Sequence, residues 1–106
     1  MYPRPIAVQS VSDYRLVITF EDGIRADLDF SPMVGRPGLF TELKNVELFR
    51  GVQLDSEAET LVWPNGADIC PDVLYHIAAQ APLPGRLEHP PAILITREQV
   101  ALPINS

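Results

Sequence analysis

The feature that most constrains the fold is a turn sequence, Glu21-Asp22-Gly23, which lies between two runs of alternating apolar and polar residues. Asp-Gly tolerates the positive φ angles that tight hairpin turns demand. In Tyr14 to Phe20 and in Ile24 to Phe30 every second residue is apolar, which is the period of a strand with one buried face. The runs therefore predict an antiparallel hairpin whose other face, with Asp27 and Asp29, is solvated and acidic.

The chain around this hairpin predicts short strands and helices separated by turn residues. We expect further strands at residues 6–11, 52–55 and 60–63, one helical turn at 39–43, and helices at 46–50 and from residue 71. Asn45 is the expected N-cap of the helix at 46–50, and Pro71 suits the first position of the next. These elements predict an α+β domain, a small antiparallel sheet of about five strands with short helices on one side.

Composition changes after residue 80, because four prolines lie between residues 81 and 92. Such a segment is typical of an extended linker. The sequence therefore predicts a domain at 1–80 and a proline-rich tail at 81–106. Thr96-Arg97-Glu98-Gln99 matches a capping box, and Pro103 limits a helix there to little more than one turn. The alternative is that Ile93, Leu94 and Ile95 pair with an edge of the sheet, in this chain or a neighbour's.

Charge and cysteine content restrict the classes of function. The formal net charge is −6, and the eight basic residues are scattered singly, which argues against a surface that binds DNA phosphates. A single cysteine, Cys70, permits no intrachain disulfide, so nothing suggests an oxidising compartment. The chain has neither a signal-peptide pattern at its start nor an apolar run that could span a bilayer. We therefore expect a cytoplasmic, bacterial-type protein without a membrane anchor.

Four short motifs, taken in order, carry a resemblance to a known family. They are Phe20-Glu21-Asp22-Gly23, Leu48-Phe49-Arg50, Trp63-Pro64-Asn65-Gly66-Ala67-Asp68-Ile69 and Pro71-Asp72-Val73-Leu74-Tyr75. With them, residues 6 to 79 resemble the bacterial domain-of-unknown-function family numbered twenty-four forty-two.

The resemblance implies a small α+β fold and no established enzyme activity. Some relatives carry a helix-turn-helix domain after this one, and others are encoded beside a second small protein, as toxin–antitoxin pairs are. Residues 80–106 are too short and too rich in proline for a helix-turn-helix pair, so we expect no direct DNA binding.

The candidate site residues have structural explanations as well as functional ones. Asp68 and Asp72 could act as a carboxylate pair, but a turn and a helix start account for them. Trp63 could anchor a partner, although a core role fits its place on a strand face with Leu61. Asp27 and Asp29 are candidates for a partner surface, while Asn65 and Tyr75 are hallmarks of the motifs above.

Cofactor chemistry has little support in the sequence. Cys70 precedes a helix, where a thiol can be activated, but a buried structural cysteine is favoured. His76 and His89 add no zinc-binding pattern to it, so no metal and no cofactor are predicted.

The leading hypothesis is therefore a non-enzymatic protein-interaction or regulatory module, such as the antitoxin-like member of a two-protein pair, with a homodimer compatible with it. The alternatives are a small-molecule sensor, which requires a deep apolar pocket, and an enzyme with a dispersed site. An exposed strand edge or a flat apolar patch would favour the interaction module.

Overall fold

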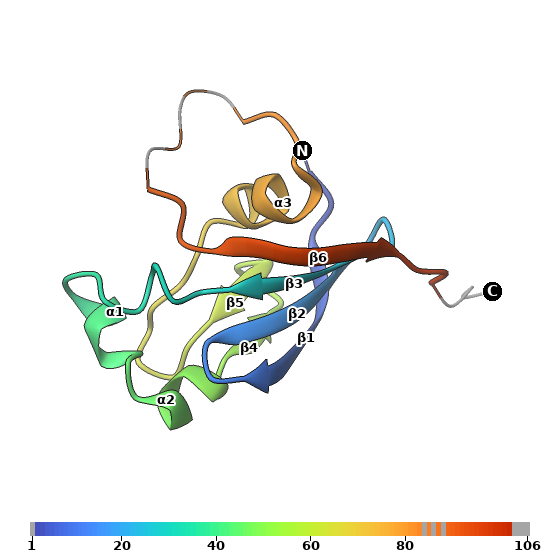
Figure 1. Ribbon diagram of the computed structural model, residues 1–106. Coiled ribbons are helices and arrows are strands. Elements are labelled where there is room, and N and C mark those ends of the chain that lie inside the picture. The colour runs from blue at the N-terminus through green and yellow to red at the C-terminus, as the bar shows by residue number, and fades with distance from the viewer. Residues whose placement is uncertain (1, 84, 86, 88, 103–106) are drawn as a thin grey trace.

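The computed structural model describes residues 2–83, 85, 87 and 89–102. Six strands and three helices follow one another along these residues (Figure 1). The α+β class is confirmed, with antiparallel strands and short helices.

The main sheet has four strands in the order β1 (Pro5–Ser12), β2 (Arg15–Phe20), β3 (Ile24–Asp29) and β6 (Ile93–Gln99). Every neighbouring pair is antiparallel. The predicted hairpin is confirmed, since β2 pairs with β3 across a turn in which Gly23 has a φ of 91°. A Cβ on Gly23 would also lie 2.6 Å from the carbonyl oxygen of Val100, so the turn and the chain after β6 both require glycine here.

Strand β6 replaces the helical turn that the capping-box pattern predicted at residues 96–99. A single helical turn satisfies few of its own backbone groups, whereas the edge of β3 offers a whole row of partners. The β-branched residues Ile93, Ile95 and Thr96 also favour a strand. The alternative interpretation of the tail, strand addition within this chain, is the arrangement observed. Whether residues 1–80 fold without β6 stays a prediction.

The remaining strands, β4 (Gln53–Asp55) and β5 (Thr60–Val62), pair with each other and form a second sheet, and an isolated antiparallel bridge joins Val62 of β5 to Asp68. The strands are therefore divided between two sheets, rather than about five in one. Two short helices, α1 (Leu39–Glu42) and α2 (Val46–Arg50), precede them, and α3 (Pro71–Ala79) follows. Asn45 caps α2 as predicted, because its side chain accepts hydrogen bonds from the backbone of Glu47 and Leu48. Pro71 begins α3, also as predicted.

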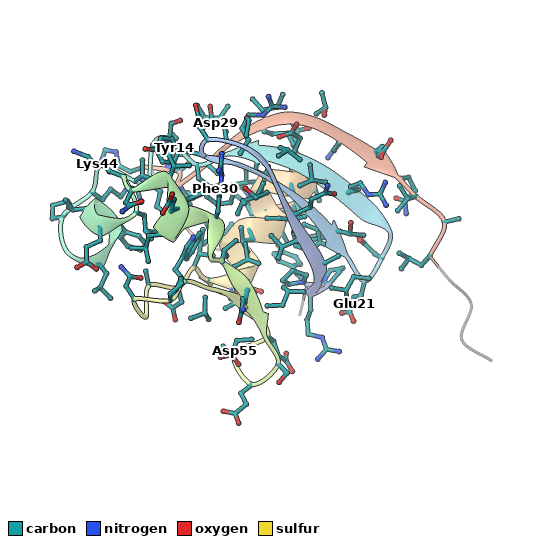
Figure 2. The ribbon with its side chains drawn as sticks, turned by 90° about the horizontal axis from the view of Figure 1, so that it is seen from below. Tyr14, Glu21, Asp29, Phe30, Lys44 and Asp55 are labelled. Carbon is teal, nitrogen blue, oxygen red and sulfur yellow. The ribbon has the colours of Figure 1, made fainter. Side chains whose placement is uncertain are left out.

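The hydrophobic core lies between the inner face of the main sheet, helix α3 and the segment that contains α2 and β5 (Figures 1 and 2). Phe30, Phe49 and Trp63 form its aromatic centre, with ring centroids 5.7 to 6.4 Å apart. Figure 2 shows Phe30 inside this layer, while the adjacent Asp29 points away from it. No helix in the described part of the chain is both long enough and apolar enough to cross a membrane.

Candidate functional site

The outer face of the main sheet is the side opposite α3. We call it the open face, because no described element packs on it. Its central charges neutralise one another: Arg15 is paired with Asp27, whose side chain is only 15% exposed. Arg25 contacts Glu98 at 3.3 Å, and Asp29 accepts a hydrogen bond from the hydroxyl of Ser31 at 2.6 Å. The predicted acidic residues therefore lie on this face, but arginines on neighbouring positions balance much of their charge.

The free edge of β6 borders the open face. Six of the seven β6 residues are exposed, and the seventh, Leu94, is half-buried against the core. Ile93 and Ile95 are 55% and 46% exposed. The strand is in contact with the sheet on one side only, so the other side carries unpaired backbone groups. An exposed edge with two large apolar side chains is a surface to which a further strand can be added.

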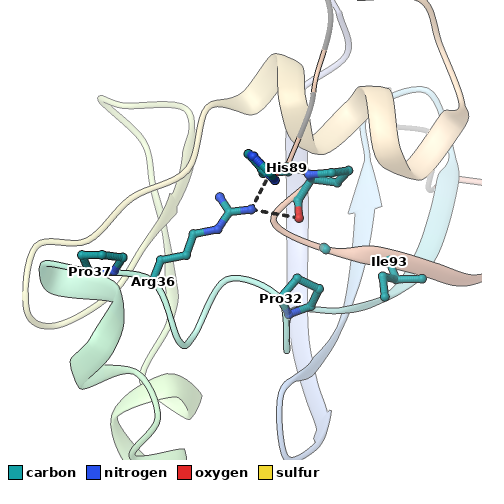
Figure 3. Close-up of a pocket in the computed structure, with 7 residues that line it drawn as sticks. Pro32, Arg36, Pro37, His89 and Ile93 are labelled. Carbon is teal, nitrogen blue, oxygen red and sulfur yellow. Dashed lines mark hydrogen bonds between the residues drawn. The ribbon is translucent and has the colours of Figure 1, made fainter.

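A cleft of about 920 Å³ lies beside the start of β6, between the loop at Pro32–Pro37 and residues His89–Ile93 (Figure 3). Its lining is mainly apolar. Arg36 crosses it and donates hydrogen bonds to the carbonyl oxygens of His89 and Pro90, the latter at 3.0 Å. The one cationic side chain that lines the cleft therefore holds the tail in place, and the cleft is open to solvent.

Tyr75 of α3 joins the helix to the β2–β3 turn. Its hydroxyl donates a hydrogen bond to the Asp22 carboxylate at 2.6 Å, and this acceptor raises the pKa of Tyr75 to about 12. Its ring packs edge-on against Phe20, with centroids 5.3 Å apart. The backbone carbonyl of Asp22 accepts a further hydrogen bond from the side chain of Gln99 at 2.7 Å. Asp22 thus connects α3, the turn and the end of β6.

Trp63 and Asn65 have structural positions. Trp63 is 2% exposed, and its indole N–H donates a hydrogen bond to the carbonyl of Phe49 at 2.9 Å. This burial matches the core role and gives the ring no surface for a partner. Asn65 stabilises the turn after β5: its side chain accepts a bond from the backbone of Ala67 and donates bonds to the Leu39 carbonyl and the Glu42 carboxylate.

The structure does not combine the carboxylates and the thiol into a catalytic group. Asp68 and Asp72 are exposed. Asp72 lies in the first turn of α3, where its negative charge interacts favourably with the positive end of the helix dipole. Cys70 is exposed rather than buried, because it occupies the N-cap position outside the first turn. In the described residues no three His, Cys, Asp or Glu side chains are grouped in a way that could hold a metal ion.

Sequence reasoning missed the residues that attach the tail. Arg36 binds the carbonyls before β6, and Arg97 donates to the carbonyl of Ala79 at the end of α3. No local motif indicates these contacts, because the partners lie 18 or more residues away in the sequence. The apolar run Ile93-Leu94-Ile95 was the one local sign in the sequence of the surface around β6. Which of these side chains face the core and which are exposed depends on the pairing of β6 with β3.

Comparisons with known proteins identify the family to which residues 5–80 correspond. In searches of curated proteins and of solved structures, nothing matched significantly. A family model described as "Protein of unknown function (DUF2442)" matches residues 5–80, from the start of β1 to the residue after α3, so the match stops before β6. Since this match covers more than half of the chain, the protein belongs to the DUF2442 family.

Proposed function

We propose that the chain is a protein-interaction module whose binding surface is the free edge of β6 together with the adjoining part of the open face. The observation that carries the proposal is the exposure of this edge, where Ile93 and Ile95 are 55% and 46% exposed on a strand that is paired on one side. Main-chain hydrogen bonds to such an edge provide affinity, and side chains on either side provide specificity.

The alternatives have weaker support in the same structure. A small-molecule sensor requires an enclosed apolar pocket with converging polar groups. The cleft at Arg36 is open, and its guanidinium is occupied by backbone carbonyls of the tail. An enzyme requires reactive groups within reach of one another. Of the carboxylates weighed for such a role, Asp27 lies on the open face and is paired with Arg15, while Asp68 and Asp72 lie exposed around the start of α3.

The finer proposal is that the chain is the regulatory, antitoxin-like member of a two-protein pair. The family resemblance supports a partner encoded beside this chain. The net charge of −6 supports a basic partner, because complementary charge accelerates association. On the open face the carboxylate of Asp29 lies beside the start of the β6 edge, opposite Ile93, whereas Asp27 is paired with Arg15. We therefore expect a cytoplasmic partner encoded beside this chain, whose association weakens with salt.

Affinity capture from the native organism tests this proposal with a matched pair of variants. Ile95→Lys adds a charge to the β6 edge, and Ile6→Lys adds the same charge to β1, where the side chain is also 46% exposed. We expect a protein that binds the wild type and Ile6→Lys, that is lost with Ile95→Lys, and that forms a stoichiometric complex when both purified chains are mixed. A complex that Ile95→Lys leaves intact would contradict the proposed surface, and saturable binding of a metabolite instead would favour the sensor.

A further inference from the structure

Strand β6 lies along the edge of β3 and is received by groups of the family region (Figure 1). Its Leu94 is half-buried against the core. Arg97 donates a hydrogen bond to the carbonyl of Ala79, the last residue of α3. Gln99 donates one to the carbonyl of Asp22, in the β2–β3 turn, at 2.7 Å. The edge and both carbonyls belong to the part of the chain that the family model matches, whereas β6 does not.

A bulge at Ile95 determines which side chains of β6 turn inward. Thr96 lies opposite Asp27 of β3. Leu94 lies opposite the next residue of β3, Leu28, so Ile95 has no counterpart. Residues three apart face opposite sides of a regular strand, but the extra residue brings Leu94 and the arginine three positions later to the same face. The inward pattern is therefore leucine, then arginine three residues later and glutamine two residues after that.

We infer that the edge of β3, together with the end of α3 and the β2–β3 turn, is a strand-binding site that β6 fills in the free chain. An extended segment of another protein with the same inward pattern replaces β6 there. In strand addition, main-chain hydrogen bonds give affinity and side chains give specificity. The specificity here comes from the core beneath the leucine and from the two carbonyls that receive the arginine and the glutamine. This inference goes beyond the proposed function, which concerns the other edge of β6.

The attachment of β6 suits an exchange of strands. Six of its seven residues are exposed, and the bulge interrupts its pairing with β3. A strand linked in the same chain competes at an effective concentration on the order of millimolar. A strand from outside therefore binds only where β6 has opened, and the fraction of open chains reduces its apparent affinity. Strand β6 thus sets a threshold that a partner strand must exceed.

The backbone of β3 provides an internal control for the opening of β6. The N–H of Val100 donates to the carbonyl of Gly23 at 2.8 Å. Because hydrogen-bonded and non-hydrogen-bonded pairs alternate along an antiparallel ladder, the amides of Arg25 and Asp27 also face β6. The amide of Ala26, which lies between them, faces β2 instead.

Hydrogen exchange in the full wild-type chain tests the opening with these neighbouring amides. After correction for intrinsic rates, we expect Arg25 and Asp27 to exchange at least about tenfold faster than Ala26. Their hydrogen bonds are lost whenever β6 opens, whereas that of Ala26 is lost only when the sheet itself unfolds. Equal exchange at all three residues would overturn the inference. The proposed function would then still stand, because its partner binds to β6 in place.

Binding of a labelled peptide with the sequence of residues 91–101 tests the site in the full-length chain. Leu94→Lys in the chain loosens β6, because this side chain is half-buried, and Ile93→Lys is the matched control, because its side chain is 55% exposed. We expect the apparent dissociation constant of the peptide to fall about tenfold with Leu94→Lys and to stay within about twofold of the wild type with Ile93→Lys. Arg97→Ala in the chain removes a surface contact and should lower this constant by a smaller factor.

The peptide itself tests the inward pattern. A peptide with Arg97→Ala should bind the Leu94→Lys chain about fivefold more weakly, because it loses the hydrogen bond to α3. Equal binding of the two peptides would overturn the assigned specificity. If neither Leu94→Lys nor Arg97→Ala in the chain improved peptide binding over the wild type, the β3 edge would not be an exchangeable site and the inference would be wrong.

Discussion

The region matched by the family model and the strand that follows it are held by different kinds of contact. Residues 5–80 bury an aromatic centre around Trp63, which is 2% exposed. Strand β6 instead has six exposed residues, one half-buried leucine and polar contacts through Arg97 and Gln99. Burial of apolar area supplies most of the free energy of folding, so the family region is expected to be the stable part. We therefore expect β6 to change the exposed surface of the domain more than its free energy of unfolding.

The largest effect is expected in the aromatic centre. Trp63→Ala removes a buried ring and leaves the carbonyl of Phe49 without its N–H donor. We expect a loss of about 3 kcal/mol in the free energy of unfolding, measured by urea denaturation. Ile95→Ala is the control, because its side chain is 46% exposed and its truncation should change stability little. An unchanged midpoint for Trp63→Ala would show that the core does not depend on this ring.

Removal of the tail separates the two regions directly. A chain of residues 1–80 loses the partial burial of Leu94 and the burial of Ala92, which is 2% exposed. We expect it to fold with a free energy of unfolding lower by about 2 kcal/mol, the value of one buried leucine side chain. The measurement is urea denaturation combined with a solubility assay. An insoluble fragment would mean that β6 is needed to cover the edge of β3, and that the domain extends past residue 80.

The features that could be predicted from the sequence are those that residues close together in the chain determine. Gly23, Asn45 and Pro71 act within a few residues of themselves, so their turn, cap and helix start were readable from the sequence. Strand β6 depends on β3, about 70 residues earlier, and its alternation is interrupted by a register shift between Asp27 and Leu28. The exposure of the β6 edge is a consequence of sheet order, which no short window of sequence contains.

The candidate site shows the same division. The core role of Trp63 followed from its strand pattern, and the structure agrees. The pairing of Asp27 with Arg15 could not be read from one strand, because the two residues belong to neighbouring strands whose register places them near each other. Cys70 was expected to be buried because free cysteines usually are, but the N-cap position exposes it.

A smaller effect is expected where the two regions meet, at Asp22. Tyr75→Phe removes the 2.6 Å hydrogen bond to this carboxylate and should cost about 1 kcal/mol near neutral pH. The pKa of Tyr75 is about 12 in the folded chain and near 10 when unfolded. Its contribution is therefore complete below pH 10 and is lost as the pH rises through 12. Denaturation at pH 8 and pH 11.5 should show the wild type and Tyr75→Phe converging, and a constant difference would contradict this contribution.

The smallest effect is expected for DNA, where we predict no measurable specific binding by this chain. In the described part of the chain, carboxylates engage Arg4, Arg15 and Arg25, and backbone carbonyls engage Arg36 and Arg97. Counterion release, which drives binding to DNA, requires basic groups that can reach the phosphates. The tail does not compensate, because it is too short for a helix-turn-helix pair and its residues Ile93–Gln99 form an edge strand. A gel-shift titration with the promoter region of the chain's own gene should show no retardation at physiological salt. Retardation that resists competitor DNA would contradict this prediction. It would mean that the chain binds DNA specifically, and that β6 and the open face need not be a protein-binding surface.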